Sequence, residues 1–491
     1  MSSPAPVSRW IALLGVAIAS FVGCLDFTIV NTAIPDIQRA LEATVGETQW
    51  IVTIFVMALS AFMVVGGRLA DLYGRRRMLQ GGLVLFALAS LGAGLAGTIG
   101  QLVAFRFVQG LGAAVLYTAS AAIVADAFPE AERGRAIGLL FAGNGLGLAL
   151  GPVAGGVLVA LWGRRGVFLI NLPFLALSGL LCGLSVRESR DPAPGGIDWP
   201  GLALLVPGML LLLFGISSIP DSGWTTPGTA GSILGGAALL AAFLRVEARA
   251  SAPLIRLDLF ANGLFLEAAI ATVALASFYC AAFFMMPLYL SDIRRIAPVQ
   301  VGLALLPTTA LVALSSPVVG RLVDRAGPRP LLRAGLALLA GSAAVQTLFT
   351  AETPLPLLLA GFALMGLGWG CVLGPSTVAA IGAVGEAAGG VAMGVSWTLH
   401  NLGGALGLAL ASAVYRAAEP AGPAAGYHAG MGFLVAVTVG ALLVIVWLGR
   451  GRRAVLQPWG SPLRPAIRGA AGEPGPRRPL RRNPLGQGRD L

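Results

Sequence analysis

Long apolar stretches recur along almost the whole chain, separated by short polar segments. A helix that crosses about 30 Å of hydrocarbon at 1.5 Å per residue needs about 20 mostly apolar residues. Fourteen windows approach this requirement, of which 231–246 is the shortest. They lie at 11–33, 49–66, 78–97, 101–123, 136–159, 166–186, 199–218, 231–246, 264–289, 301–319, 331–349, 355–379, 390–413 and 430–448. The pattern predicts an all-α polytopic membrane protein with fourteen spans.

Composition supports this class. The chain has 491 residues, of which 56% are hydrophobic and 11% charged, whereas soluble domains carry about 25% charged residues. A signal peptide explains one apolar stretch but not many. The four cysteines lie inside apolar runs without metal or redox spacing, so we expect neither disulfides nor a metal site.

Charge distribution indicates orientation. The net charge is +11 and all 33 basic residues are arginine, but they lie in short loops and in the tail, so we do not expect a nucleic-acid partner. With the N-terminus inside, 26 arginines lie inside and 6 outside, and Arg106 lies within a span. The positive-inside rule then places both termini in the cytoplasm. We therefore expect a multipass protein of the bacterial inner membrane.

The C-terminal tail, residues 450–491, contains ten arginines, two acidic residues and many prolines and glycines. Such a composition cannot bury a core, so we expect a disordered cytoplasmic segment. It is interpreted either as a topology anchor that touches anionic headgroups or as a regulatory or partner site.

One segment occurs twice. GRLAD at 67–71 and GRLVD at 320–324 are 253 residues apart, and a weaker match joins 145–151 with 405–411. Repeats of this kind are typical of transporters built from duplicated helical halves with a cavity between them. The predicted domains are a six-helix bundle (1–190), two inserted spans (191–258), a second six-helix bundle (259–449) and the tail.

Four motifs carry a family resemblance. GGRLADLYGRRRML (66–79) resembles the loop signature of the major facilitator superfamily. LDFTIVNTAIPDI (25–37), LVAFRFVQGLGAA (102–114) and GNGLGLALGPVAGG (143–156) resemble the first-, fourth- and fifth-span motifs of its fourteen-span drug:proton antiporter branch. The resemblance extends over roughly residues 10–449. It implies the major facilitator fold, two six-helix bundles plus two inserted helices.

The function implied by this resemblance is proton-driven export of small amphipathic compounds by alternating access. A lipid or metabolite exporter and a proton-coupled importer of the same fold are the alternatives. A multipass membrane enzyme is disfavoured, because the sequence has no paired carboxylates, metal site or nucleophile constellation at one membrane face. We expect no cofactor besides the proton gradient, membrane lipids as surroundings, and a functional monomer.

Two charged residues fall inside predicted spans. An ionised side chain at the bilayer centre costs roughly 2.5 to 3.5 kcal/mol on insertion scales, so Asp26 and Arg106 need a cavity or a partner. Counting from the outer helix ends, Asp26 lies about 10 Å deep and Arg106 about 8 Å, so they can form a pair. The pair either fixes packing only, or Asp26 takes up a proton while Arg106 tunes its affinity.

The repeated loop has two interpretations. It is a topology anchor, or, as the resemblance implies, a charge latch that stabilises one rocking state. In the latch, glycines allow the tight turn and Asp71 accepts from arginine or from a helix N-terminus. The second copy has Pro328 and Pro330 in place of two arginines, which weakens the expectation there. The latch candidates are Gly67, Asp71, Gly74, Arg75, Arg76 and Asp324.

The fifth predicted span carries a glycine stripe at four-residue spacing. Small residues allow helix backbones to approach closely in lipid. The stripe is therefore either a packing surface or, as the resemblance implies, a hinge or sealed interface that prevents leak. Its residues are Gly143, Gly147, Gly151, Pro152 and Gly155.

The remaining polar and aromatic residues of the spans are candidates for the cavity lining. Glu267, near the inner end of its span, either snorkels to water or has a transport role. His400 is either a titrating group or a satisfied hydrogen-bonding residue. Asn31 lies on a different face of its helix from Asp26. The candidates are Asn31, Gln109, Asn144, Glu267, Trp397, His400 and Asn401.

Overall fold

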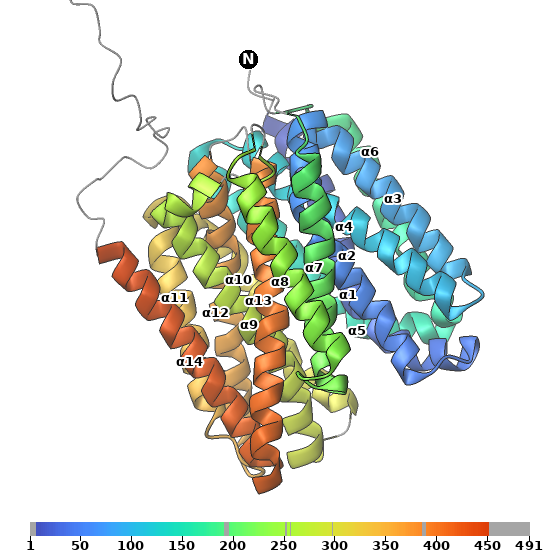
Figure 1. Ribbon diagram of the computed structural model, residues 1–491, viewed down its shortest axis with the longest axis vertical. Coiled ribbons are helices and arrows are strands. Elements are labelled where there is room, and N and C mark those ends of the chain that lie inside the picture. The colour runs from blue at the N-terminus through green and yellow to red at the C-terminus, as the bar shows by residue number, and fades with distance from the viewer. Residues whose placement is uncertain are drawn as a thin grey trace, which may run out of the picture. The chain divides into compact units, whose positions relative to one another are not determined.

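The computed structural model describes residues 6–190, 196–250, 253–255, 257–296, 298–384 and 389–450. Within these residues it is helical, without strands (Figure 1). The first helix set comprises α1 (Pro6–Leu41), α2 (Val45–Tyr73), α3 (Arg75–Leu95), α4 (Ile99–Ala127), α5 (Glu130–Leu169) and α6 (Asn171–Ser185). Two helices follow, α7 (Trp199–Ser222) and α8 (Pro227–Glu247). The second helix set comprises α9 (Gly263–Leu288), α10 (Pro298–Ala326), α11 (Pro328–Gln346), α12 (Leu355–Val384), α13 (Gly389–Ala418) and α14 (Pro423–Arg450).

The predicted windows coincide with these helices, but not every helix is apolar enough to count as a span. Eleven stretches of the described residues have the length and composition to cross a membrane. Helices α11 and α13 and the first part of α5 are not among them. The multipass architecture is therefore established, whereas the number of fourteen crossings is not. The shortest window, 231–246, lies on a helix of 21 residues that does meet the criterion.

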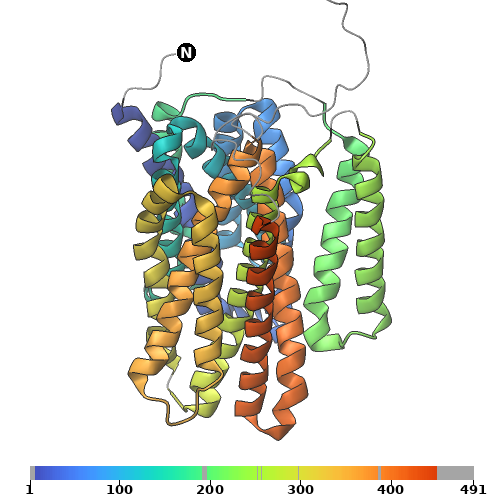
Figure 2. The same cartoon turned by 90° about the vertical axis from the view of Figure 1, so that its left-hand side faces the viewer.

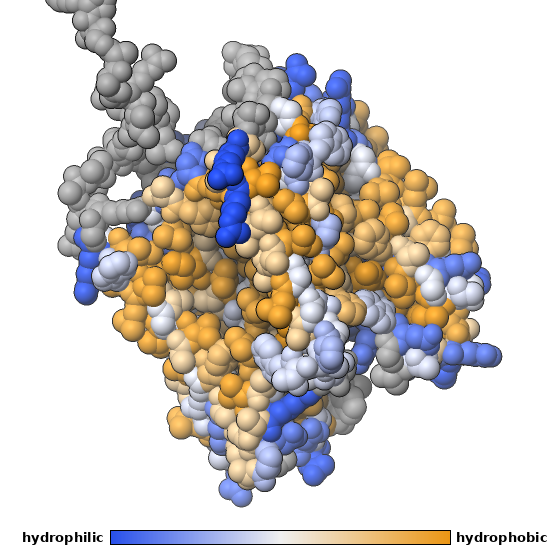
Figure 3. Space-filling model, viewed as in Figure 1, coloured by the Kyte–Doolittle hydropathy of each residue, from blue (hydrophilic) through white to orange (hydrophobic). Residues whose placement is uncertain are grey.

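Hydrophobic residues cover the sides of the helices, and hydrophilic residues gather toward their ends (Figure 3). This distribution is the one that a bilayer selects, because lipid tails solvate apolar side chains whereas polar groups remain in water. The predicted tail lies outside the described residues beyond Arg450.

Helix α5 is not one continuous span. Gly163 has φ +60° and ψ −165°, which breaks the helix between the fifth and sixth predicted windows. A positive φ favours glycine because it carries no Cβ. The segment after Gly163 leads into α6, so one glycine separates the two windows.

The glycine stripe of α5 packs on α1, inside the first helix set. A Cβ at Gly147 would lie 2.6 Å from the Phe21 carbonyl oxygen, and a Cβ at Gly151 would overlap the Thr28 side chain. Gly155 approaches Thr32 and Ile29 of α1 in the same way. The side chain of Pro152 lies outside the described part of the structure. The stripe therefore acts as a packing surface here.

The two helix sets meet along two tight contacts, one between α2 and α13 and one between α5 and α10. In the first, Gly67 and Gly390 approach so closely that a Cβ on either would overlap the other's backbone. In the second, Gly320 and Gly134 do the same. Each contact joins a helix of one set to a helix of the other, so each must change if the sets move relative to one another.

Helices α7 and α8 form an antiparallel pair at the side of the two sets, green in Figures 1 and 2. They pack on each other through glycines, since a Cβ at Gly236 would lie 2.6 Å from the amide nitrogen of Leu212. Helix α7 shares an apolar core with α2 and α13. The Phe214 ring stacks on Trp50 of α2 with centroids 5.7 Å apart. The pair thus contacts both helix sets through α7.

Candidate functional site

Asp26 of α1 and Arg106 of α4 form an ion pair between Oδ2 and Nη1. Both side chains are completely buried, with 0% exposure. Removal of one partner from such a pair leaves an uncompensated charge in a low-dielectric medium, which costs several kcal/mol. The structure thus places Asp26 and Arg106 in direct contact, as their similar depth in the predicted spans indicates.

A ring of neutral polar groups completes the surroundings of Asp26. Its Oδ1 accepts hydrogen bonds from Asn171 Nδ2 at 2.8 Å and from Gln109 Nε2 at 3.4 Å. Gln109 Nε2 also donates to Ser90 Oγ at 2.8 Å, and Gln109 Oε1 accepts from Arg106 Nη1 at 3.0 Å. Helices α1, α3, α4 and α6 thus supply one buried network around the carboxylate.

Arg106 has two further stabilising contacts, both from α2. Its Nε donates to the carbonyl oxygen of Ile51 at 3.0 Å, and its guanidinium carbon lies 4.2 Å from the centroid of the Phe55 ring. A cation over an aromatic face is attracted by the ring quadrupole. The Nη2 atom is buried and has no hydrogen-bond partner within the described residues. One edge of the cation is therefore available to another acceptor.

Ser90 and Asn171 belong to the network but were not among the sequence candidates. Each is a polar residue flanked by mostly apolar residues in a predicted span, at 0% exposure. Such a residue is costly in a membrane core unless it is paired, which is the signal that could have identified both. Asn31, by contrast, is exposed and donates only to the Phe27 carbonyl of its own helix, at 3.5 Å.

An aromatic cluster lies between the two helix sets. The Trp397 ring of α13 is 5.7 Å from Tyr117 of α4 and 6.4 Å from Phe141 of α5, between ring centroids. On the α9 and α12 side, Tyr279 stacks on Trp369 with centroids 4.4 Å apart and planes at 17°. His400 joins the two groups. We call Tyr117, Phe141, Tyr279, Phe283, Trp369, Trp397 and His400 the aromatic cluster.

His400 is a paired member of this cluster. Its Nδ1 lies 2.9 Å from Thr272 Oγ1 of α9, and its ring is 4.9 Å from Trp397 and 5.6 Å from Tyr279. The side chain is buried. The geometry agrees with a satisfied hydrogen-bonding residue, and the titrating role is not needed to account for it.

Trp369 and Asn144, on helices of the aromatic cluster, each have a polar atom without a hydrogen-bond partner within the described residues. These atoms are Nε1 of Trp369 and Oδ1 of Asn144, and both residues are at least 95% buried. Asn144 follows Phe141 by three residues on α5, so the two share a helix face. Buried polar atoms without partners are costly, which makes them candidate contacts for a bound molecule. Asn401, one turn after Trp397, instead lies 3.5 Å from Met63 Sδ.

The first copy of the repeated loop binds the opposite helix set. Asp71 of α2 accepts hydrogen bonds from the backbone amides of Gly390 at 3.1 Å and Val391 at 2.9 Å, in the first turn of α13. It also accepts from Arg75 Nε at 3.0 Å and Nη2 at 2.9 Å. Arg75 Nη1 donates to Asp126 of α4 at 2.5 Å. Both expected partners of Asp71, an arginine and a helix N-terminus, are present together.

The other residues of this loop shape the turn. Gly74 has φ +109°, and its Cβ position is occupied by the Glu188 carboxylate. Glu188 accepts from the backbone amides of Arg76 and Arg77 at 3.1 and 3.2 Å. The Arg76 side chain donates to the Gly183 carbonyl of α6 at 2.6 Å. Arg76 is thus bound within the first helix set rather than to the second.

The second copy makes the matching contact without an arginine clamp. Asp324 of α10 accepts from the backbone amides of Gly134 at 2.6 Å and Arg135 at 2.9 Å, near the start of α5. Pro328 stands where the first copy has Arg75, so no guanidinium reaches Asp324 from that position. The proline substitution therefore removes the clamp but not the contact between the carboxylate and the helix amides.

Glu267 differs from expectation. It is 1% exposed and does not reach water. Instead its Oε1 lies 3.3 Å from Nε of Arg329 on α11. The snorkelling prediction is wrong because α11 brings a cation to the carboxylate, which makes exposure unnecessary.

The sequence matches the family model of the Major Facilitator Superfamily over residues 16–408. The chain is 35% identical to the multidrug resistance protein Stp of Mycobacterium tuberculosis over 414 residues, covering 84% of this chain and 76% of that protein. It is 34% identical to the puromycin resistance protein pur8 of Streptomyces alboniger over 462 residues, covering 90% and 91%. Among solved structures, the human organic anion transporter MFSD10 aligns with a TM-score of 0.64 at 17% identity, over 90% of this chain and 100% of that chain.

Proposed function

Because the chain belongs to the major facilitator superfamily, we propose that it exports small amphipathic compounds in exchange for protons. Relatives at about one-third identity are drug and antibiotic resistance proteins, which supports efflux of the multidrug type. The family consists of transporters, so we assign no catalytic role. In this proposal the protein crosses the bacterial inner membrane fourteen times as a monomer, with both termini in the cytoplasm.

The buried pair of Asp26 and Arg106 carries the proposal. A carboxylate fixed in a membrane core is a functional site by default, and here it is the acidic member of a fully buried ion pair. Protonation of Asp26 Oδ2 cancels the attraction to Arg106 Nη1 and leaves the guanidinium with excess positive charge. The network then favours a different arrangement of α1 and α4. Proton uptake and helix movement are thereby linked.

The aromatic cluster is the proposed substrate site. Its rings come from both helix sets, so a bound molecule touches each set and its affinity changes when they rock. Flat faces bind flat apolar compounds, while the unpaired Trp369 Nε1 and Asn144 Oδ1 offer one donor and one acceptor. Cys24, two residues before Asp26 on α1, lies 3.2 Å from Tyr117 of the cluster, between Sγ and Oη. This contact joins the aromatic cluster to the helix that carries Asp26.

The two latches set the state of the transporter. Asp71 and Asp324 each hold a helix of the opposite set at the ends predicted to face the cytoplasm. With both latches bound, access from that side is closed, and we propose that their release accompanies opening to the cytoplasm. Two states that differ in a few such contacts are the usual basis of alternating access.

Ethidium export from cells tests the proposal. The assay compares wild type with Asp26→Asn, with and without an uncoupler, at matched amounts of membrane-inserted protein. Asp36→Asn is the control, since Asp36 lies on the same helix but pairs with Arg39 at its exposed end. We expect uncoupler-sensitive export from wild type and the control, and none from Asp26→Asn. If Asp26→Asn exports ethidium as wild type does and remains sensitive to the uncoupler, Asp26 is not the coupling site.

The direction of transport is tested separately in inverted vesicles with an internal pH indicator. An antiporter releases lumenal protons when ethidium is added outside energised vesicles. Proton movement in the same direction as ethidium would instead identify the proton-coupled importer.

A further inference from the structure

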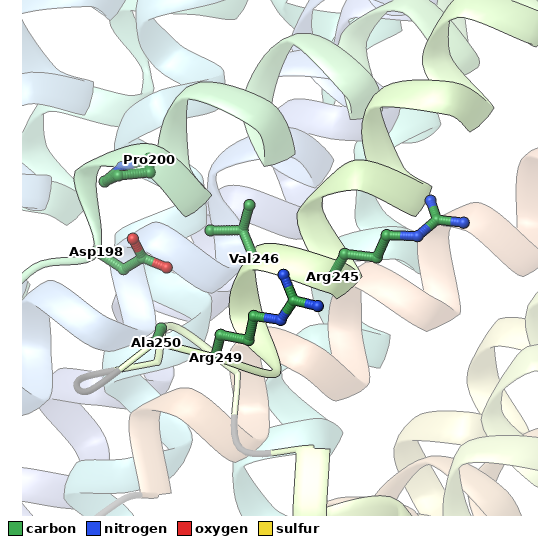
Figure 4. A pocket seen from close by; sticks show the side chains of 6 residues that line it. All are labelled: Asp198, Pro200, Arg245, Val246, Arg249 and Ala250. Atoms are coloured by element: carbon green, nitrogen blue, oxygen red, sulfur yellow. The ribbon is translucent and has the colours of Figure 1, made fainter.

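A recess of about 360 Å³ opens where α7 begins and α8 ends. Figure 4 shows the Asp198 carboxylate on the α7 side of the recess and the two guanidinium groups on the α8 side. The lining residues are Asp198, Pro200, Arg245, Val246, Arg249 and Ala250. Neither the proton site nor the aromatic cluster includes any of them.

Two exposed tryptophans place this recess at the level of the lipid headgroups. Trp199, at the first position of α7, is 66% exposed, and Trp224, just beyond its other end, is 45% exposed. Tryptophan concentrates at both membrane interfaces. The 24 residues of α7 extend about 36 Å, enough to cross the hydrocarbon core. The recess beside Trp199 therefore faces one headgroup layer.

The α8 side of the recess is basic. Arg245 lies in the last turn of α8 and Arg249 just beyond its end, four residues later, and both are exposed. Neither forms an ion pair within the described part of the chain. Arginine stems lie along apolar surface while the guanidinium remains at the polar interface. Guanidinium groups so placed match the phosphate of a phospholipid.

The α7 side is acidic. Asp198 caps α7, since its Oδ1 accepts from the Gly201 amide at 3.0 Å, while its Oδ2 is buried. Glu247 lies behind it at 3% exposure. Its Oε1 accepts from the Ile255 amide at 2.5 Å, and its carboxyl group is hydrogen-bonded to that of Asp198. The two carboxyl groups meet beside Gly201, where a Cβ would overlap Asp198 and be 2.9 Å from Glu247 Oε2, so the α7 side of the recess carries a pair of adjoining acids.

We propose that this recess binds the headgroup of an aminophospholipid, with the phosphate on Arg245 and Arg249 and the primary ammonium on Asp198. A phosphate without an ammonium group would be repelled by the carboxyl groups on the α7 side. A quaternary ammonium has no N–H group that could donate to the Asp198 carboxylate. Phosphatidylethanolamine carries a phosphate for the basic α8 side and a primary ammonium for the acidic α7 side. Because α8 is largely open to lipid, the acyl chains of this phospholipid can extend along α8.

Native mass spectrometry of the purified full-length protein tests the proposal. The protein is titrated with phosphatidylethanolamine, phosphatidylglycerol or phosphatidylcholine of identical acyl chains. We expect wild type to bind phosphatidylethanolamine most tightly. Loss of both guanidiniums in Arg245→Gln/Arg249→Gln should weaken its binding about tenfold, as two interfacial arginines are worth roughly that factor or more. Arg321→Gln/Arg325→Gln, an exposed pair with the same spacing on α10, is the matched control and should change binding little.

The variant Asp198→Asn tests the acidic α7 side of the recess separately from the basic α8 side. Asparagine caps a helix as well as aspartate does, so α7 should be retained. We expect this variant to lose the preference for phosphatidylethanolamine over phosphatidylglycerol while still binding phospholipid. Equal binding of the two lipids by wild type, an unchanged preference in Asp198→Asn, or equal losses in the recess and control arginine pairs would each overturn the proposal. The readout does not involve transport, so it is independent of the proposed function.

Discussion

Asp71 and Asp324 occupy matching positions of the two helix sets, and each accepts hydrogen bonds from two successive backbone amides at the start of a helix of the other set. Of the two, Asp71 alone also accepts hydrogen bonds from an arginine side chain among the described residues, that of Arg75. Hydrogen bonds to charged groups contribute about 1.5 to 3 kcal/mol each. The two latches are therefore equivalent in geometry and unequal in strength.

This inequality predicts different effects of removing each acid. Asp71→Ala should lower ethidium export more than Asp324→Ala, because it also removes one of the two carboxylates that bind the buried Arg75 guanidinium. Spin labels at the predicted cytoplasmic ends of α2 and α13 should show longer distances in Asp71→Ala. Equal losses of export, with unchanged distances in both variants, would contradict the latch interpretation.

Close backbone approach at the latches predicts a steric effect. Gly67→Ala places a methyl group on the backbone of Gly390, and overpacking of this kind costs about 1 to 3 kcal/mol. We expect reduced export despite normal membrane insertion. Gly81→Ala on α3 is the control, because nothing lies within 4 Å of its Cβ position. Full activity of Gly67→Ala would show that the two helices need not come this close.

The unpaired indole nitrogen of Trp369 predicts a change in substrate preference. Trp369→Phe keeps an aromatic ring beside Tyr279 but removes the N–H donor. Export of an aromatic dye that carries hydrogen-bond acceptors should fall about fivefold to tenfold, because a lost hydrogen bond is worth about 1 to 1.5 kcal/mol. An apolar dye without acceptors should be exported as before. Trp447→Phe, at an exposed position of α14, is the control. A parallel fall for both compounds would indicate a packing role only.

The hydrophobic pattern was sufficient to predict the helices, because a bilayer imposes length and apolarity on every span. It could not identify Asn171 and Ser90 as neighbours of Asp26, since no periodicity links residues on different helices. It also misjudged Glu267, whose partner Arg329 lies on another helix. Contacts within a helix are local in sequence, whereas contacts between helices depend on packing.

The internal repeat shows a related difficulty. The match of 145–151 with 405–411 implies a shift of 260 residues. The latch contacts instead make Gly134 equivalent to Gly390 and Gly138 equivalent to Gly394, a shift of 256. The difference is four residues, about one helical turn. A stripe of small residues at four-residue spacing also matches when it is shifted by four residues. The sequence alone therefore did not determine which residues of the two helix sets are equivalent.

Substrate-induced proton release tests the coupling role of Asp26 most directly. Purified protein in weakly buffered detergent solution, at a series of starting pH values, is mixed with ethidium while a pH indicator is recorded. Binding and protonation are reciprocal, so a substrate that disfavours the protonated state must release protons. The account predicts proton release from wild type and from Asp36→Asn, and none from Asp26→Asn that still binds ethidium. Equal proton release from Asp26→Asn and wild type would contradict it.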